Sequence, residues 1–135
     1  MSNPALTTSL QKPASRASVK RHLKAEEEAH ERAVHKAVDA RDGHRCRVCG
    51  RRCDPHAIDL LRRAHRHHLV YRSAGGATTT GNLVSLCADC HADVHRHVLD
   101  VRGDGDTGIK IWCLSAEDGW YQVKRETACG QTERD

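Results

Sequence analysis

Two Cys-x-x-Cys pairs constrain the fold of this chain more than any other feature of its sequence. Cys46 and Cys49 form the first pair, and Cys87 and Cys90 form the second. Two such pairs supply four thiolates, which zinc accepts in a tetrahedron. The 37 residues between the pairs exceed the usual spacing of a zinc ribbon, and an inserted antiparallel strand–loop–strand would bring the pairs back together. We therefore predict a structural zinc site with these four cysteines as its ligands.

The composition indicates that a bound metal ion would be needed to stabilise the fold. The chain has 135 residues, of which 38% are hydrophobic and 3% aromatic, and it contains no Phe. A single domain of this size with so few aromatic residues has a thin core, so a bound metal ion would supply stability that apolar burial does not.

The cysteines indicate metal binding in a reducing compartment rather than disulfides in a secreted protein. Their number, seven, is odd, and the first 16 residues lack the apolar stretch of a secretory signal. No segment has the roughly 18 apolar residues of a membrane span. We therefore expect a cytoplasmic protein of a bacterium or a phage-infected host cell, without a membrane partner. We interpret Cys113 and Cys129, which lie outside the two pairs, as free thiols.

Patterning along the chain predicts an α+β fold. Residues 18–42 favour a helix because they are rich in Ala, Glu, Lys and Arg and contain no Gly or Pro, and Gly43 follows them. Strands are expected over 66–71 and 82–85, a helix from 86 to about 98, and two further strands in the runs IKIWCL and GWYQVK. We expect five segments, namely a disordered N-terminus (1–17), a helix (18–42), a core (43–98), a β-hairpin extension (99–126) and a disordered tail (127–135).

Four of the eleven histidines suit a second metal site. His91 and His95 are four residues apart on a predicted helix, so both project from one face. His67 and His68 are adjacent on a predicted strand and point to opposite sides, so only one of them can join that pair as a ligand. Three imidazoles leave positions open for water and a phosphate oxygen, and the fourth histidine could take a proton from the water. For His91 and His95 alone, a solvated helical pair is the alternative interpretation.

Positive charge surrounds these candidate sites. Residues 41–72 hold nine arginines and three aspartates. Arginine has a planar fork of donors that suits phosphate groups. A solvated charged surface is the plain alternative, but the overlap with the histidines favours a polyanionic partner.

Residues 43–97 resemble the HNH endonucleases, the cysteine-containing branch of the ββα-metal (His-Me finger) nucleases. The resemblance is carried by CRVC, HHL with a following Gly-Gly loop, NL, and LCADCH with a final histidine. It implies a ββα-metal core with a zinc-knuckle staple, here preceded by a helix and followed by a hairpin. Tyr71 stands where the family often has proline, which concerns the shape of the loop.

The resemblance also implies a role for each histidine. The first of the paired histidines is a metal ligand in this family and the second is the general base, which carries over to His67 and His68. Asn82 corresponds to the asparagine that fixes the loop and keeps the base oriented. His91 and His95 complete the set of ligands for the catalytic metal.

The implied activity is metal-dependent hydrolysis of phosphodiester bonds in DNA, by nicking or double-strand cleavage. The implied cofactors are a structural Zn²⁺ and a divalent catalytic ion (Mg²⁺, Mn²⁺, Ni²⁺ or Zn²⁺). DNA is the expected partner, in a phage or mobile-element setting, with a protein partner or a second copy of the chain as further candidates. A non-catalytic zinc-stabilised module that binds nucleic acid is the alternative, and RNA is an alternative substrate. The arginines expected to grip the nucleic-acid backbone are Arg72, Arg96, Arg66, Arg63 and Arg62.

Overall fold

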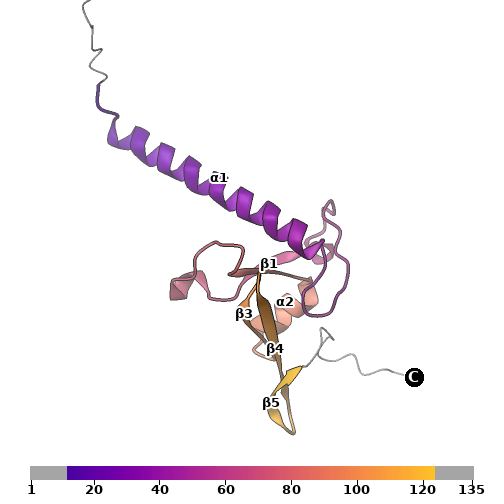
Figure 1. The fold of residues 1–135 in the computed structure, drawn as a ribbon. Helices are drawn as coiled ribbons and strands as arrows, with labels where there is room; N and C mark the ends of the chain where they lie inside the picture. Colours follow the sequence, from indigo (N-terminus) through magenta and orange to yellow (C-terminus); the bar gives the residue numbers. More distant parts are fainter. Residues whose placement is uncertain (1–11, 124–135) are drawn as a thin grey trace, which may run out of the picture. The chain divides into compact units, whose positions relative to one another are not determined.

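The computed structural model describes residues 12–123 of the chain. The tail expected to be disordered (127–135) and most of the expected disordered N-terminus (1–17) lie outside these residues. In chain order, the elements are α1 (Arg16–Asp42), η1 (Leu60–Arg62), β1 (His65–His68), η2 (Arg72–Ala74), β2 (Leu83–Leu86), α2 (Ala88–His95), β3 (Leu99–Asp104), β4 (Gly108–Ser115) and β5 (Gly119–Val123), as Figure 1 shows. None of the helices within residues 12–123 has the length and apolar character needed to cross a membrane.

The chain divides into two compact units between His30 and Glu31, and this boundary falls within α1. In the second unit, α1 buries Val34 and Val38, four residues apart on one face, against Leu83 of β2. The helix ends at Asp42 because Gly43 follows in the left-handed region with φ of 59°. The sequence placed the start of α1 two residues too late and its end correctly.

A ββα unit forms the centre of the second unit, and the predicted fold class is confirmed. Strands β1 and β2 pair antiparallel, with His67 opposite Val84 and His68 opposite Leu83. The helix α2 follows β2 directly, capped at its N-terminus by Cys87, whose sulfur accepts from the backbone N–H of Cys90. The antiparallel pair returns the chain to the first cysteine pair, as its spacing predicted.

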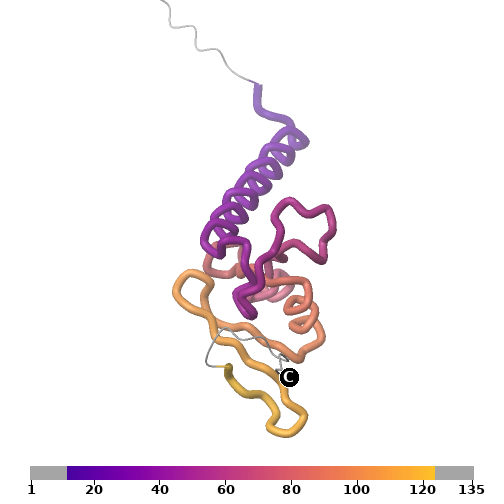
Figure 2. The backbone as a smooth tube through the Cα atoms, turned by 90° about the vertical axis from the view of Figure 1, so that its right-hand side faces the viewer, coloured from indigo at the N-terminus to yellow at the C-terminus, as the bar shows by residue number. Residues whose placement is uncertain are grey.

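Three antiparallel strands follow α2, where the sequence predicted two. Figure 2 follows them in orange and yellow, with β4 between β3 and β5. The extra strand is β3, in which Leu99 and Val101 are buried with the period of two that a half-buried strand shows. It was missed because its apolar alternation is short, with only Leu99 and Val101 before Arg102 and Gly103. The helix α2 ends earlier, at His95, and His97 lies in the left-handed region with φ of 59°.

The main core is small and is built around sulfur. Its buried members include Cys46, Cys87 and Cys90 together with aliphatic residues of β2, α2, β3 and β4. Cys113 of β4 is buried and disulfide-bonded, so its prediction as a free thiol is wrong. Cys129 lies outside the described residues.

A buried carboxylate at the end of α1 ties the helix to the ββα unit. Asp42 accepts hydrogen bonds from Arg41 Nε (2.7 Å), Arg47 Nη1 (2.8 Å) and the backbone N–H of Ser85 (2.9 Å), and its side chain is fully buried. Burial alone would raise the pKa of Asp42, but the hydrogen bonds from Arg41, Arg47 and Ser85 outweigh it and lower that pKa. Asp42 therefore fixes the relative positions of α1, the first cysteine pair and β2.

Asp42→Asn is expected to lower the free energy of unfolding by about 3 kcal/mol, because it leaves the half-buried guanidinium groups of Arg41 and Arg47 without this buried carboxylate. The unfolded chain binds a proton to Asp42 more readily than the folded chain does, so this contribution is present above the ordinary pKa of 3.8 and is lost at lower pH. Denaturant unfolding at neutral and acidic pH measures both effects. Equal stability of variant and wild type at neutral pH would contradict the assignment.

Candidate metal centres and catalytic cleft

The four cysteines of the two pairs meet in one cluster. Their sulfur atoms all lie within 4.8 Å of one another, and Cys46, Cys87 and Cys90 are buried. A zinc–sulfur distance of about 2.3 Å gives a tetrahedron with edges of about 3.8 Å. Cys49 Sγ and Cys87 Sγ are 3.7 Å apart. The donor set and its size therefore fit zinc, which leaves no coordination position for a substrate.

The thiols of this cluster differ in pKa, so they lose their protons at different pH values. A hydrogen bond from Cys90 and backbone N–H groups lower the pKa of Cys46 to about 5, against the effect of burial. Burial raises the pKa of Cys49 to about 11, and the hydrogen bond to Cys46 raises the pKa of Cys90. A cluster of this kind holds one thiolate readily and further thiolates at a cost, which a divalent cation removes by replacing the protons.

Three histidines of β1 and α2 form a second cluster. His67 comes from β1, and His91 and His95 come from successive turns of α2, with one ring nitrogen of each within 4.8 Å of the others. His91 Nε2 and His95 Nε2 are 3.1 Å apart, close to the edge of about 3.4 Å expected for imidazoles on one tetrahedral ion. The donor set fits a divalent transition metal and, with three ligands, leaves coordination positions open.

The environment keeps two of these imidazoles neutral, which is the form that binds metal. Burial, followed by the neighbouring His91 and His95, lowers the pKa of His67 to about 4. Burial also lowers the pKa of His91. Protons therefore compete weakly with a metal ion for these nitrogens near neutral pH.

His68 lies on the opposite face of β1 from His67, as the alternation of the strand predicted. Its Nε2 is 3.4 Å from Thr78 Oγ1 and 3.4 Å from Arg72 Nε. Burial and the charge of Arg72 lower the pKa of His68. This imidazole is neutral near neutral pH and can accept a proton.

One cleft is lined both by the three clustered histidines and by His68. It has a volume of about 290 Å³, and Tyr71 and Ser73 complete its lining together with two arginines. Tyr71 touches the edge of His67, with ring centroids 5.7 Å apart. The cleft therefore brings a candidate base and a candidate metal centre to one volume, and its lining histidines are His67, His68, His91 and His95.

Asn82 fixes the loop that joins β1 to β2. Its Oδ1 accepts from the backbone N–H of Val70 (2.8 Å), and its Nδ2 donates to the carbonyls of Val70 (3.0 Å) and Ala77 (2.8 Å). Gly76 lies so close to the Val70 carbonyl that a side chain there would collide with it, since an added Cβ would be 1.8 Å from the oxygen. The Gly-Gly sequence and Asn82 thus hold the two ends of this loop together.

Of the five candidate arginines, two line the histidine cleft and three do not. Arg66 and Arg72 line the histidine cleft. Arg62 lines a separate hollow of about 240 Å³ beside Cys53. Arg63 donates to the carbonyl of Ala57, and Arg96 is paired with an aspartate one turn earlier in α2.

Residues of α1 that the sequence did not single out hold the two cleft arginines. Glu31 forms an ion pair with Arg72, whose Nη2 also donates to Thr78 Oγ1 at 3.0 Å. Asp39 accepts two hydrogen bonds from Arg66. In the sequence, Glu31 and Asp39 are ordinary charged residues of a polar helix, and only the tertiary fold brings them to the cleft.

Part of the chain is similar in sequence to known proteins. Residues 46–97 match the family model described as HNH endonuclease. The chain is 38% identical over 50 residues to the type IV methyl-directed restriction enzyme EcoKMcrA of Escherichia coli (strain K12), a match covering 37% of this chain and 18% of that enzyme. It is 29% identical over 70 residues to anaredoxin of Nostoc sp., covering 52% of this chain and 82% of anaredoxin. The chain thus matches less than a fifth of the restriction enzyme's length.

Proposed function

Because residues 46–97 match the HNH endonuclease family, we propose that the chain hydrolyses phosphodiester bonds in DNA with a divalent metal ion held by His67, His91 and His95. One observation carries the proposal, namely the single cleft that contains these three imidazoles and the separate imidazole of His68. A binding module without activity has no need of an open metal centre beside an unligated base.

His68 is the general base of the proposed reaction. Its neutral imidazole takes a proton from a water molecule, whose oxygen attacks phosphorus in line with the bond to the 3′ oxygen. A new phosphorus–oxygen bond forms and the bond to the 3′ oxygen breaks. The departing oxygen takes a proton from solvent, so the products carry 5′-phosphate and 3′-hydroxyl ends. A divalent ion in this site supplies positive charge that polarises the phosphate and stabilises the departing oxygen.

Two further residues support this chemistry without exchanging protons. Asn82 fixes the loop after β1, so the strand end that carries His68 keeps one geometry. Arg72 lies at the cleft beside His68 and can contact a nonbridging phosphate oxygen. The four cysteines would hold a structural zinc, which would join the first cysteine turn to the N-terminus of α2, the helix that carries two of the proposed metal ligands.

Incubation of supercoiled plasmid with Mg²⁺, Mn²⁺, Ni²⁺ or Zn²⁺ tests the proposal. We expect nicked or linear DNA with at least one of these ions and no cleavage with excess EDTA. Intact plasmid with all four ions, from protein that still shifts the plasmid in a gel, would instead identify a zinc-stabilised binding module. Single-stranded DNA and RNA in the same assay define the range of substrates.

Asn82→Ala is expected to lower the cleavage rate about 10²-fold, because the loop loses three hydrogen bonds and His68 loses its fixed position. Thr79→Ala is a matched control, since it removes only one long hydrogen bond to the same loop, 3.3 Å from the backbone N–H of Asn82. Cleavage rates and melting temperatures of both variants provide the measurement. Asn82→Ala cleaving within threefold of wild type would contradict the positioning role.

A further inference from the structure

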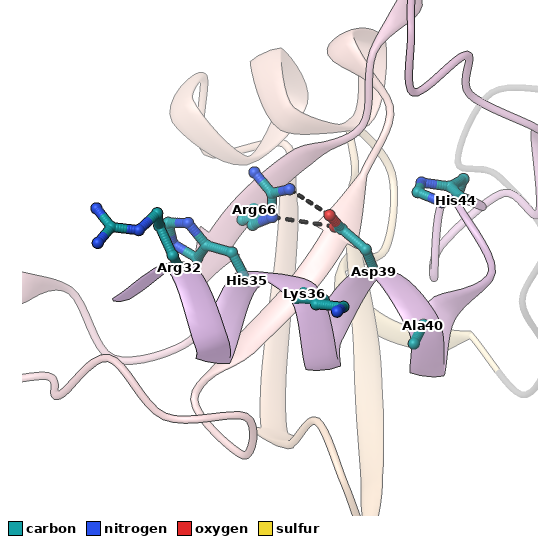
Figure 3. A pocket seen from close by; sticks show the side chains of 7 residues that line it. All are labelled: Arg32, His35, Lys36, Asp39, Ala40, His44 and Arg66. Carbon is teal, nitrogen blue, oxygen red and sulfur yellow. Dashed lines mark hydrogen bonds and ion pairs between the residues drawn. The ribbon is translucent and has the colours of Figure 1, made fainter. Parts of the chain in front are cut away.

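A second groove lies beside the histidine cleft, along the C-terminal turns of α1. It has a volume of about 500 Å³, larger than the cleft, and Arg32, His35, Lys36 and Asp39 line it from α1 (Figure 3). His44 and Arg66 line its other sides. All of these residues except Arg66 precede the segment that matches the HNH family, so the family match assigns them no role.

Arg66 connects the groove to the cleft. Its side chain lines both hollows, so the two share a wall rather than opening at unrelated places. Arg66 and His68 are two residues apart on β1 and therefore project from the same face. Figure 3 shows the guanidinium of Arg66 held by the carboxylate of Asp39. A substrate bound at His68 can therefore continue past Arg66 onto α1.

The charge of the groove suits a polyanion. Its one carboxylate, Asp39, is already engaged by Arg66. Among the ion pairs of residues 12–123, none includes Arg32 or Lys36, and both side chains are exposed. Since they are four residues apart on one helix, they are neighbours on its surface and can reach consecutive phosphates of one strand.

The geometry points to a binding site for the phosphodiester backbone of duplex DNA in this groove, with Arg32 and Lys36 contacting phosphates to one side of the bond that is cut. This inference rests on the proposed function, because the groove is assigned to the same substrate. It makes α1 a part of the DNA-binding surface, in addition to its packing against β2.

The test compares two double variants that each replace one arginine and one lysine with glutamine. Arg32→Gln with Lys36→Gln alters the groove. Arg102→Gln with Lys110→Gln alters an equally charged pair on β3 and β4, which are cross-strand partners away from the groove. Both are made in a His68→Ala background so that the labelled duplex stays intact, and fluorescence anisotropy measures binding over a range of salt concentrations.

The groove variant is expected to bind roughly tenfold more weakly near physiological salt, with a salt-dependence slope smaller by about two, one for each lost phosphate contact. The control variant should bind within about twofold of its parent. Unchanged affinity and slope in the groove variant, or an equal loss in the control, would overturn the inference.

The two proposals fail in different ways. If otherwise wild-type protein cleaves plasmid while the groove variant binds normally, only the groove assignment is wrong. If no metal ion supports cleavage while the groove variant binds weakly, the groove stands as a DNA site and the nuclease proposal is wrong. Circular dichroism of each variant shows whether α1 retains its helical structure.

Discussion

Cys87→Ser is expected to unfold the ββα unit at temperatures at which the wild type is folded. Cys87 is buried, provides one of the four clustered sulfurs, and caps the N-terminus of α2. Structural zinc contributes apparent binding free energies of about 10–16 kcal/mol in zinc-finger peptides, more than the total stability of a typical small domain. The core around this cluster contains few large side chains, so little remains to replace that contribution.

Metal analysis and thermal unfolding measure the effect together. We expect Cys87→Ser to lose bound zinc and its cooperative unfolding transition, and chelation of the wild type to have the same effect. Cys53→Ser is the matched control, because Cys53 is also buried in this core but does not belong to the sulfur cluster. It should keep its zinc and its transition. A Cys87→Ser variant that melts like wild type would show that the sulfur cluster does not stabilise the fold.

The sulfur and imidazole clusters could be predicted because their members have short, regular spacings. The two cysteines of each pair are separated by two residues, so a turn brings their side chains together. His91 and His95 are separated by three residues, so a helix places them on one face whatever the remaining fold. The opposite orientation of His67 and His68 follows from the pleat of any strand. The length of the insert between the cysteine pairs then required an antiparallel return, which the register of β1 and β2 supplies.

Interactions between distant segments could not be predicted in the same way. Glu31 and Arg72 are 41 residues apart in sequence, and Asp42 and Ser85 are 43 apart. Each contact depends on the angle at which α1 meets β2, which is set by Val34, Val38 and Leu83 together. In the sequence, Asp42 is simply the last polar residue of a polar helix. A buried carboxylate is recognisable only when its three donors are seen around it.

The strand β3 shows that a short alternation of apolar and polar residues is easily missed in a sequence. Leu99 and Val101 alternate with polar residues, which is the pattern of a half-buried strand. The alternation contains only these two apolar residues, and Gly103 and Asp104, residue types typical of turns, end the strand. The predicted helix also continued to about Val98. The chain instead leaves the helix at His95, and a left-handed residue at His97 redirects it into β3.

His68→Ala is expected to lower the cleavage rate by about 10²–10⁴-fold, the usual contribution of a positioned general base. The substitution leaves the three-imidazole cluster complete, because His67 faces the opposite side of β1. It also leaves the sulfur cluster and the loop contacts of Asn82 unchanged. Metal binding and the melting temperature should therefore remain close to those of the wild type, while the chemical step slows.

His91→Ala provides the complementary result, because it removes a proposed ligand and keeps the proposed base. It should lose both cleavage and binding of the catalytic metal, measured by calorimetric titration of zinc-loaded protein with Ni²⁺ or Mn²⁺. His56→Ala, at an exposed histidine outside the cleft, should change neither property. If His68→Ala cleaved as fast as His56→Ala, a proton acceptor other than this imidazole would have to activate the water. If it instead lost metal like His91→Ala, His68 would be a ligand rather than the base.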